Sequence, residues 1–161
     1  FSGVIFMELI LKRATCEDAE LIWKMQIEAF SDLYEKYQYT DTSPATEPLE
    51  KILSRLRQCF TYYYIIEVDK NIVGALRVVD KKEKGSAKRI SPIFILKKYR
   101  NMGIAQAAII EAERIHGNDN WELDTILSEK GNCYLYEKMG FKSTGKTEKV
   151  NDKMTLVFYQ K

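Results

Sequence analysis

The sequence predicts a single domain of the α+β class, in which helices and β-hairpins share one core. Three observations lead to this prediction. The chain has 161 residues, which is enough for one sizeable core and short for two domains. Hydrophobic residues make up 45% and charged residues 30%, a balance that excludes disordered, collagen-like and coiled-coil chains. Apolar residues recur at helical spacing in some segments and form β-rich runs with tight turns in others, without a repeat or a linker.

One strand and two helices are expected at the N-terminal side. Residues 8–12 (ELILK) predict the strand, and Thr15 with Asp18 forms a T-x-x-D capping box that marks a helix start. The apolar positions of the first helix are Ala19, Trp23, Ile27 and Phe30, and those of the second are Leu49, Ile52, Leu53 and Leu56. The polar, tyrosine-rich residues 31–46 between them predict a loop or a broken helix.

Strands dominate the middle of the chain. They are expected at residues 61–68, 72–79 and 90–96. Residues 69–71 form a tight hairpin turn between the first two strands, and the charged residues 80–89 form the loop before the third. Pro92 suggests an edge or a bulge in that third strand, because proline has no amide hydrogen to donate.

The C-terminal part alternates between helices and strands. A helix face carries Ile104, Ala108, Ala112 and Ile115, and residues 117–120 end that helix. The later elements are a strand at 123–127, a short helix at 133–139 and a strand pair at 141–147 and 154–159. The prediction therefore comprises about seven strands and about four helices.

Charge, cysteines and histidine exclude several functional classes. A net charge of +2 is too nearly neutral for a dedicated nucleic-acid binder, and no apolar run is long enough to span a membrane. Cys16, Cys59 and Cys133 lie far apart without C-x-x-C pairing, which argues against a disulfide framework and a zinc site and favours a cytoplasmic location. His116 is the only histidine, so a histidine metal cluster is excluded and no metal is expected.

Residues 140–147 (GFKSTGKT) match the phosphate-binding pattern G-x-x-x-x-G-K-[ST]. That loop needs a strand before it and a helix after it, because the helix N-terminus supplies the amides that hold the phosphates. Here a helical segment precedes the match, and a turn and a strand are expected after it. We therefore interpret Gly140 as a left-handed helix cap and Phe141 as the start of a buried strand.

Residues 100–105 (RNMGIA) lie directly between a predicted strand and a predicted helix. Backbone amides in such a turn form an anion site. Gly103 permits a positive φ angle or close backbone approach, and Arg100 can add a charge-assisted contact. A plain turn with a solvated basic face is the alternative interpretation.

A second segment, residues 132–141 (NCYLYEKMGF), follows the next predicted strand. Together the two segments resemble the GNAT superfamily of acyl-CoA-dependent N-acetyltransferases, which carries [QR]-x-x-G-x-[GA] after its fourth strand and N-x-x-x-Y-x-x-x-G-F after its fifth. Both patterns occur here in that order, about 30 residues apart. The resemblance covers Met7 to Tyr159 and implies a central, mostly antiparallel mixed sheet flanked by helices. We expect residues 7–161 to form this one domain and residues 1–6 to be a cloning remnant, since they lack signal-peptide features.

The resemblance implies acetyl-CoA as co-substrate. The fourth strand would lend its backbone to the pantetheine arm, with the Ile93 amide facing the thioester carbonyl, and the loop that follows would hold the pyrophosphate. Asn132 would bond the pantetheine or the turn around it, and it is also a good helix N-cap. The implied cofactor-binding residues are Ile93, Phe94, Ile95, Arg100, Asn101, Met102, Gly103, Ile104, Ala105 and Asn132.

Tyr136 matches the family's usual general acid, although a tyrosine in mid-helix is more often a core residue. A tyrosine is protonated at neutral pH and can donate to the departing thiolate. The general base is not visible, because the predicted fourth strand contains no acid. The remaining candidates are a water chain or one of Glu28, Asp32, Glu47 and Glu67, each of which is also an ordinary surface charge.

The function implied is acetyl transfer to a primary amine of a small molecule or peptide, by direct attack in a ternary complex. The amine would lie near residues 31–46 and 62–64, whose tyrosines and acids suit a cation, unless those tyrosines only pack the helix connection. The side chains in question include Tyr34, Tyr37, Tyr39, Asp32, Asp41 and Glu47. The alternative is a non-catalytic module of the same fold that senses acyl-CoA. We expect no nucleic-acid or membrane partner, and the family permits a homodimer.

Overall fold

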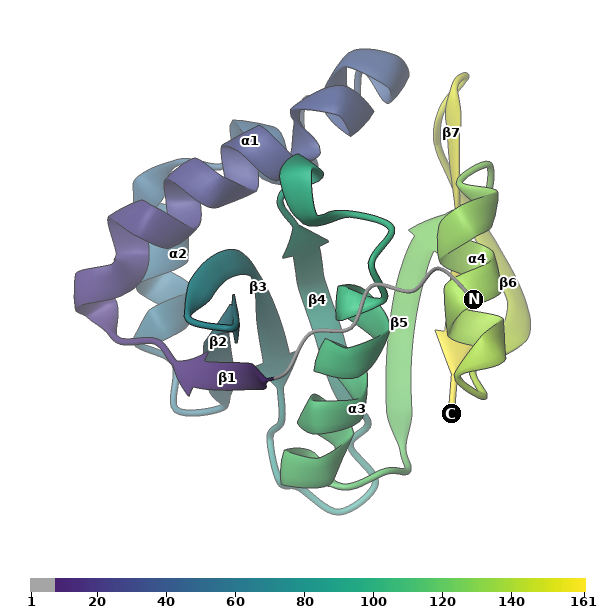
Figure 1. The fold of residues 1–161 in the computed structure, drawn as a ribbon. Coiled ribbons are helices and arrows are strands. Elements are labelled where there is room, and N and C mark those ends of the chain that lie inside the picture. Colours follow the sequence, from purple (N-terminus) through teal and green to yellow (C-terminus); the bar gives the residue numbers. More distant parts are fainter. Residues whose placement is uncertain (1–7) are drawn as a thin grey trace.

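The computed structural model describes residues 8–161, so the expected remnant at residues 1–6 and the expected start at Met7 lie outside the described part. Within it there are seven strands and four α-helices (Figure 1). The strands are β1 (Leu9–Arg13), β2 (Thr61–Val68), β3 (Asn71–Val79), β4 (Lys88–Ile95), β5 (Trp121–Ile126), β6 (Lys142–Asn151) and β7 (Met154–Gln160). The helices are α1 (Ala19–Tyr37), α2 (Leu49–Leu56), α3 (Ile104–His116) and α4 (Lys130–Lys138).

The strands form one mixed sheet in the order β1-β2-β3-β4-β5-β7-β6. Every neighbouring pair is antiparallel except β4 and β5, which run parallel. The predicted α+β domain with a mostly antiparallel mixed sheet is therefore confirmed.

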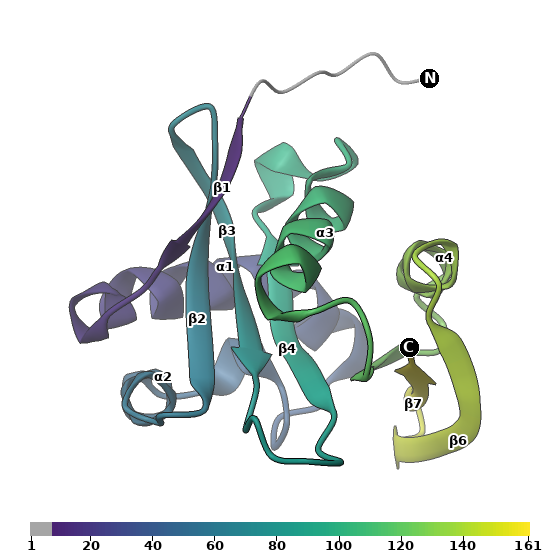
Figure 2. The ribbon, with the colours of Figure 1, turned by 90° about the horizontal axis from the view of Figure 1, so that it is seen from below.

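Helices cover both faces of the sheet, as Figure 2 shows from below. One buried cluster contains residues of α3 and α4 and includes Ile104, Ala108, Ile109, Cys133 and Tyr136. The cluster on the opposite face contains residues of α1 and α2 and includes Ala19, Ile22, Met25, Ala29 and Ile52. The core is thus divided by the sheet into two layers.

The parallel pair β4–β5 is short. The two strands pair only at Lys88↔Trp121 and Arg89↔Glu122, which lie at their starts. Beyond these pairs the strands diverge (Figure 1), so the rest of β4 has a strand neighbour on the β3 side only. We call the interval between the unpaired parts of β4 and β5 the gap, and the candidate site is built around it.

Local turn and cap predictions agree with the structure. The capping box of Thr15 and Asp18 is formed, and it opens a 3₁₀ turn that leads into α1. Asp69 and Lys70 have positive φ angles of 47° and 71° and make the tight β2–β3 turn. Gly140, directly after α4, has a φ of 94°. The chain turns back there, and the Phe141 amide donates to the Tyr136 carbonyl of α4 at 3.0 Å.

The tyrosine-rich segment differs from the prediction. Residues 31–37 continue α1 without a break, and the irregular part begins only at Gln38. The physical reason is that Leu33 and Tyr37 extend the apolar stripe of the helix and pack with Ile126 and Met154, which are distant in sequence. The last helix also starts at Lys130, three residues before the predicted position.

Residues 140–147 do not form a phosphate-binding loop. Gly140 and Phe141 follow the end of α4, and residues 142–147 lie on β6. Phe141 is buried, but the buried strand predicted to start there is wrong, because most side chains of β6 are exposed at this edge of the sheet. The next element is the strand β7, so no helix follows this segment within the described chain. The bulge expected at Pro92 is present as a register shift in the β3–β4 ladder.

Candidate active site

Backbone groups of β4 point into the gap at alternate residues. The Leu96 amide donates to the Val73 carbonyl of β3 at 2.8 Å. Neighbouring residues of a strand direct their amides and carbonyls to opposite sides, so Phe94 faces β3 while Ile93 and Ile95 face the gap. Ile93 therefore presents the amide that the sequence assigned to the thioester carbonyl. Phe94 does not present its backbone there, and its buried side chain packs in the α1–α2 cluster.

The loop before α3 presents a set of unpaired helix amides. The first helical hydrogen bond runs from the Ala107 amide to the Gly103 carbonyl at 3.1 Å, so the amides of residues 104–106 have no acceptor within the helix. Gly103, at a φ of 77°, gives α3 no side-chain cap. Among the loop's side chains, Ile104 is buried, Met102 and Ala105 are half-buried, and Asn101 is exposed. Amides and helix dipole together form a seat for an anion.

Arg100 is used differently from the sequence expectation. Its Nε donates to the Ile95 carbonyl at 2.9 Å, and its Nη2 donates to the Ala29 carbonyl of α1 at 2.7 Å. Its Nη1 lies 3.8 Å from the carboxylate of Asp32. The guanidinium therefore joins α1 to the end of β4 and positions the loop. Its charge stays beside the amide seat, but these donors are already engaged.

Tyr136 lies on α4 in the same buried cluster as Ile95 and Ile104. Its ring packs against Phe141 and Tyr159, with centroids 5.9 and 6.3 Å away. Burial raises the pKa of Tyr136 to about 12, and the negative charge of Asp124 acts in the same direction. Its hydroxyl makes no hydrogen bond within residues 8–161 and is protonated at neutral pH. This is the state that a proton donor requires.

Asp124 is a candidate that the sequence analysis missed. It lies on β5 two residues after the last β4–β5 pair, at the start of the gap, and is ion-paired to Arg89. Leu123 and Ile126 belong to clusters on opposite faces of the sheet, so alternation places Asp124 on the α1 side. Asp124 and Tyr136 thus approach the gap from opposite faces. A charged residue inside the strand predicted at 123–127 was the available signal.

The carboxylates named from the sequence are engaged or lie elsewhere. Glu47 accepts two hydrogen bonds from Arg55, at 2.9 and 2.7 Å, and one from Gln26 at 2.7 Å. Burial alone would raise the pKa of Glu47, but the hydrogen bonds and charge of Arg55 outweigh it and the pKa is lowered. Glu28 is exposed on α1, and Glu67 lies at the hairpin end of β2.

Asn132 is the third residue of α4 rather than its N-cap, which is Glu129. Its side-chain amide lies 3.5 Å from the Thr125 hydroxyl of β5, and the residue is exposed. Thus the polar end of Asn132 sits beside the C-terminal half of β5, on the far side of the gap from β4.

The last turn of α1 is fastened to the β5 side of the sheet. The Tyr37 hydroxyl is bonded to Ser128 and donates to Glu129, which also accepts from Lys36 at 2.8 Å. Asn151, at the end of β6, donates to the Tyr37 carbonyl at 2.9 Å. Tyr37 is buried, and so is Tyr39, so both serve packing rather than an open amine site.

One pocket opens beside this turn. It has a volume of about 530 Å³ and is lined by Ser31, Tyr34 and Glu35 of α1 and by Gln38, which directly follows the helix. Tyr34 and Glu35 give it an aromatic ring and a carboxylate. Asp41, in the irregular segment that follows, is exposed.

Between residues 8 and 161, no three His, Cys, Asp or Glu side chains come together as a metal site. In the same range, no helix combines the length and the apolar character needed to cross a bilayer.

Comparison with solved structures relates the fold to known acetyltransferases. A spermidine N-acetyltransferase from Vibrio cholerae in complex with CoA and spermine has a TM-score of 0.74 and 16% identity, covering 94% of this chain and 93% of that one. PaiA N-acetyltransferase from Thermoplasma acidophilum, in complex with coenzyme A, has a TM-score of 0.68 and 15% identity, covering 96% and 100%. At these identities the likeness concerns the fold.

Sequence comparison gives the family. Human N-acetyltransferase 8 is 27% identical over 116 residues, which are 68% of this chain and 51% of that protein. N-acetyltransferase 8B, also human, is 26% identical with the same coverage, so the chain spans about half the length of these curated relatives. The model of the acetyltransferase (GNAT) family matches residues 20–141. Since this match covers most of the chain and the fold agrees with it, the chain belongs to the GNAT acetyltransferase family.

Proposed function

We propose that this domain transfers an acetyl group from acetyl-CoA to a primary amine of a small molecule or peptide, by direct attack in a ternary complex. The observation that carries the proposal is the gap between β4 and β5. The Ile93 backbone borders it on the β4 side, and the amides at the start of α3 and the Tyr136 hydroxyl belong to the elements that pack beside it. These groups suit the pantetheine arm, the pyrophosphate and the sulfur of one extended thioester.

The Ile93 amide is aimed at the carbonyl oxygen of the thioester, where negative charge develops during attack. The amine nitrogen forms a bond to the carbonyl carbon, and the carbon–sulfur bond then breaks. The sulfur leaves as a thiolate and takes the phenolic proton of Tyr136. The tyrosinate regains a proton from solvent, and the acetylated nitrogen releases the extra proton that it carries after attack, so atoms and charges balance over the turnover.

The attacking amine must lose a proton, and we assign Asp124 as the acceptor. It reaches the gap from the face opposite Tyr136, so the amine and the departing thiolate have separate proton partners. Arg89 fixes the position of its carboxylate. The proton passes from the amine to Asp124 and then to solvent, since Asp124 is only partly buried, with its side chain 23% exposed.

A cationic amine suits the acceptor side best. The pocket beside the end of α1 carries Glu35 and the ring of Tyr34, and both attract a cation. Glu47 is held by Arg55 and Asp32 lies near two basic groups, so Glu35 is the carboxylate that we assign to the amine. The related fold of a spermidine acetyltransferase agrees with a basic acceptor of this kind.

The proposal is tested by calorimetric titration with acetyl-CoA, with ATP–magnesium as control, followed by a free-thiol release assay with a panel of primary amines. We expect saturable acetyl-CoA binding, silence with ATP, and amine-dependent thiol release. Binding without turnover for any amine would refute the enzyme and support the acyl-CoA sensor. A homodimer and a cytoplasmic location stay predictions of the sequence.

A further inference from the structure

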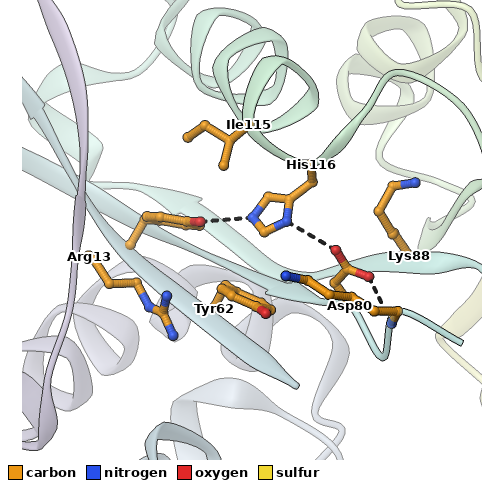
Figure 3. Close-up of a pocket in the computed structure, with 8 residues that line it drawn as sticks. Arg13, Tyr62, Asp80, Lys88, Ile115 and His116 are labelled. Carbon is orange, nitrogen blue, oxygen red and sulfur yellow. Dashed lines mark hydrogen bonds and ion pairs between the residues drawn. The ribbon is translucent and has the colours of Figure 1, made fainter. Parts of the chain in front are cut away.

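A second pocket lies at the opposite end of α3 from the amide seat. It has a volume of about 500 Å³ and is lined by Arg13, Tyr62, Tyr64, Asp80, Lys82, Lys88, Ile115 and His116 (Figure 3). Strands β1, β2 and β4, the loop after β3 and the end of α3 all contribute to it. Because α3 has 13 residues, the two ends of the helix are ~20 Å apart. The pocket is therefore separate from the proposed acetyl-transfer site.

A hydrogen-bonded chain forms its floor. The Tyr64 hydroxyl is 2.8 Å from Nε2 of His116, and Nδ1 of His116 is 3.2 Å from the Asp80 carboxylate (Figure 3). The ionised carboxylate can only accept, so Nδ1 carries the proton and Nε2 accepts from Tyr64. The side chains of His116 and Asp80 are only 5% and 12% exposed. This fixed chain holds the imidazole edge toward the pocket.

Three cations surround this floor. The guanidinium of Arg13 lies 4.4 Å from the ring centre of Tyr62, and the ammonium of Lys82 lies 5.3 Å from the same centre. Lys88 donates to a loop carbonyl at 2.7 Å. None of the three forms an ion pair with a carboxylate in the part of the chain that the structure describes. Asp80 is the one acid of the lining, so the pocket carries an excess of two positive charges when His116 is neutral.

These charges affect the pKa of His116. Burial lowers the pKa of His116 below its ordinary value; Asp80 opposes this effect, and Lys82 and Lys88 add to it. Tyr62 and Tyr64 face the imidazole from β2, with ring centres 4.9 and 5.9 Å away. An anion between the lysines would offset their repulsion and favour the imidazolium.

We propose that this pocket is a second ligand site, which binds a small phosphate-bearing molecule through Arg13, Lys82 and Lys88. A dianionic phosphate matches the two excess charges. The volume exceeds what a bare phosphate fills and lies in the range of small-molecule sites. Ile115, which is 42% exposed, offers an apolar contact for the organic part of the ligand. The inference is independent of the acetyl-transfer proposal.

The single histidine makes the test specific. His116 is the only histidine of the chain, so its Cε1–H resonance in an NMR spectrum reports this pocket alone. Inorganic phosphate is added to the full chain at constant ionic strength, with chloride as the balancing anion. We expect a saturable shift of that resonance and a raised apparent pKa of His116.

Matched variants distinguish a specific phosphate site from a general attraction of anions to basic side chains. Lys82→Gln and Lys88→Gln should each weaken the phosphate response at least about fivefold, as expected for losing one charge-assisted contact. Lys142→Gln, an equal charge change on exposed β6 at the far edge of the sheet, should leave the response unchanged. If chloride shifts the resonance as much as phosphate does, or Lys142→Gln weakens the response equally, the proposal is wrong. A response to a single-stranded oligonucleotide but not to phosphate would also overturn it.

Discussion

Replacing Tyr136 by phenylalanine tests the proposed proton donor directly. The substitution keeps the ring that packs against Phe141 and Tyr159 and removes only the hydroxyl. That hydroxyl has no hydrogen-bond partner within residues 8–161, so we expect the free energy of unfolding to change by less than about 1 kcal/mol. The variant should therefore fold and bind acetyl-CoA as the unchanged protein does. Any loss of activity in this variant should then come from a slower chemical step.

The expected loss follows from the acidities involved. General acids contribute about 10²- to 10⁴-fold to rate, and a thiol of pKa about 8.5 already leaves readily as a thiolate. We expect Tyr136→Phe to lower kcat by about 100-fold, the low end of that range. Because burial raises the pKa of Tyr136 to about 12, its phenol stays protonated through neutral and mildly alkaline pH. In the unchanged enzyme the rate should rise with pH as the amine deprotonates, without a fall until about pH 11.

The assay is steady-state thiol release at saturating acetyl-CoA and amine, measured across pH. Tyr159→Phe is the matched control, because it removes a neighbouring hydroxyl that donates to Glu137 at 2.7 Å. This control should lower the melting temperature more than Tyr136→Phe and leave kcat within about twofold. If Tyr136→Phe also leaves kcat within about twofold, the reasoning is refuted and the sulfur departs without this donor.

Three further substitutions test the rest of the site. Gly103→Glu should lower acetyl-CoA affinity in calorimetry at least about tenfold, because it places a side chain and a negative charge beside the free amides of α3, at a residue with a positive φ angle. Gly145→Glu, at a similar φ on β6, should leave the affinity unchanged. Asp124→Asn should lower kcat at neutral pH by about 100-fold in the thiol assay, whereas Glu122→Gln, which removes the other carboxylate near Arg89, should change it by less than about twofold. Arg100→Gln should raise KM for acetyl-CoA several-fold with a smaller effect on kcat, since it releases α1 from the loop. Equal effects of a variant and its control, or an unchanged KM for Arg100→Gln, would contradict these assignments.

Features that depend on one backbone position could be predicted from the sequence. The capping box at Thr15, the turn at Asp69 and Lys70 and the cap at Gly140 each follow from the local preference of a residue type. The same is true of the loop at Gly103, where a glycine directly precedes a helix. The local order of helix and strand around residues 140–147 was likewise sufficient to predict that this segment is not a phosphate-binding loop.

Features that depend on distant partners could not be predicted. The continuation of α1 to Tyr37 is stabilised by Ile126 and Met154, and no local sequence pattern predicts that contact. The guanidinium of Arg100 reaches the carbonyl of Ala29, 71 residues earlier, so its positioning role is visible only in three dimensions. Asp124 was missed for the same reason, because its place in the gap depends on where β4 and β5 separate.

The attachment of the last turn of α1 has a mechanical consequence. The halves β1–β4 and β5–β7 of the sheet share only two residue pairs along their strands, and they also contribute to the same buried cluster. The bonds from Tyr37 to Ser128 and from Asn151 to Tyr37 tie the first half to the second at the far end of the gap. The strand pairs at one end of the gap and these hydrogen bonds at the other therefore hold the two halves together on both sides of it.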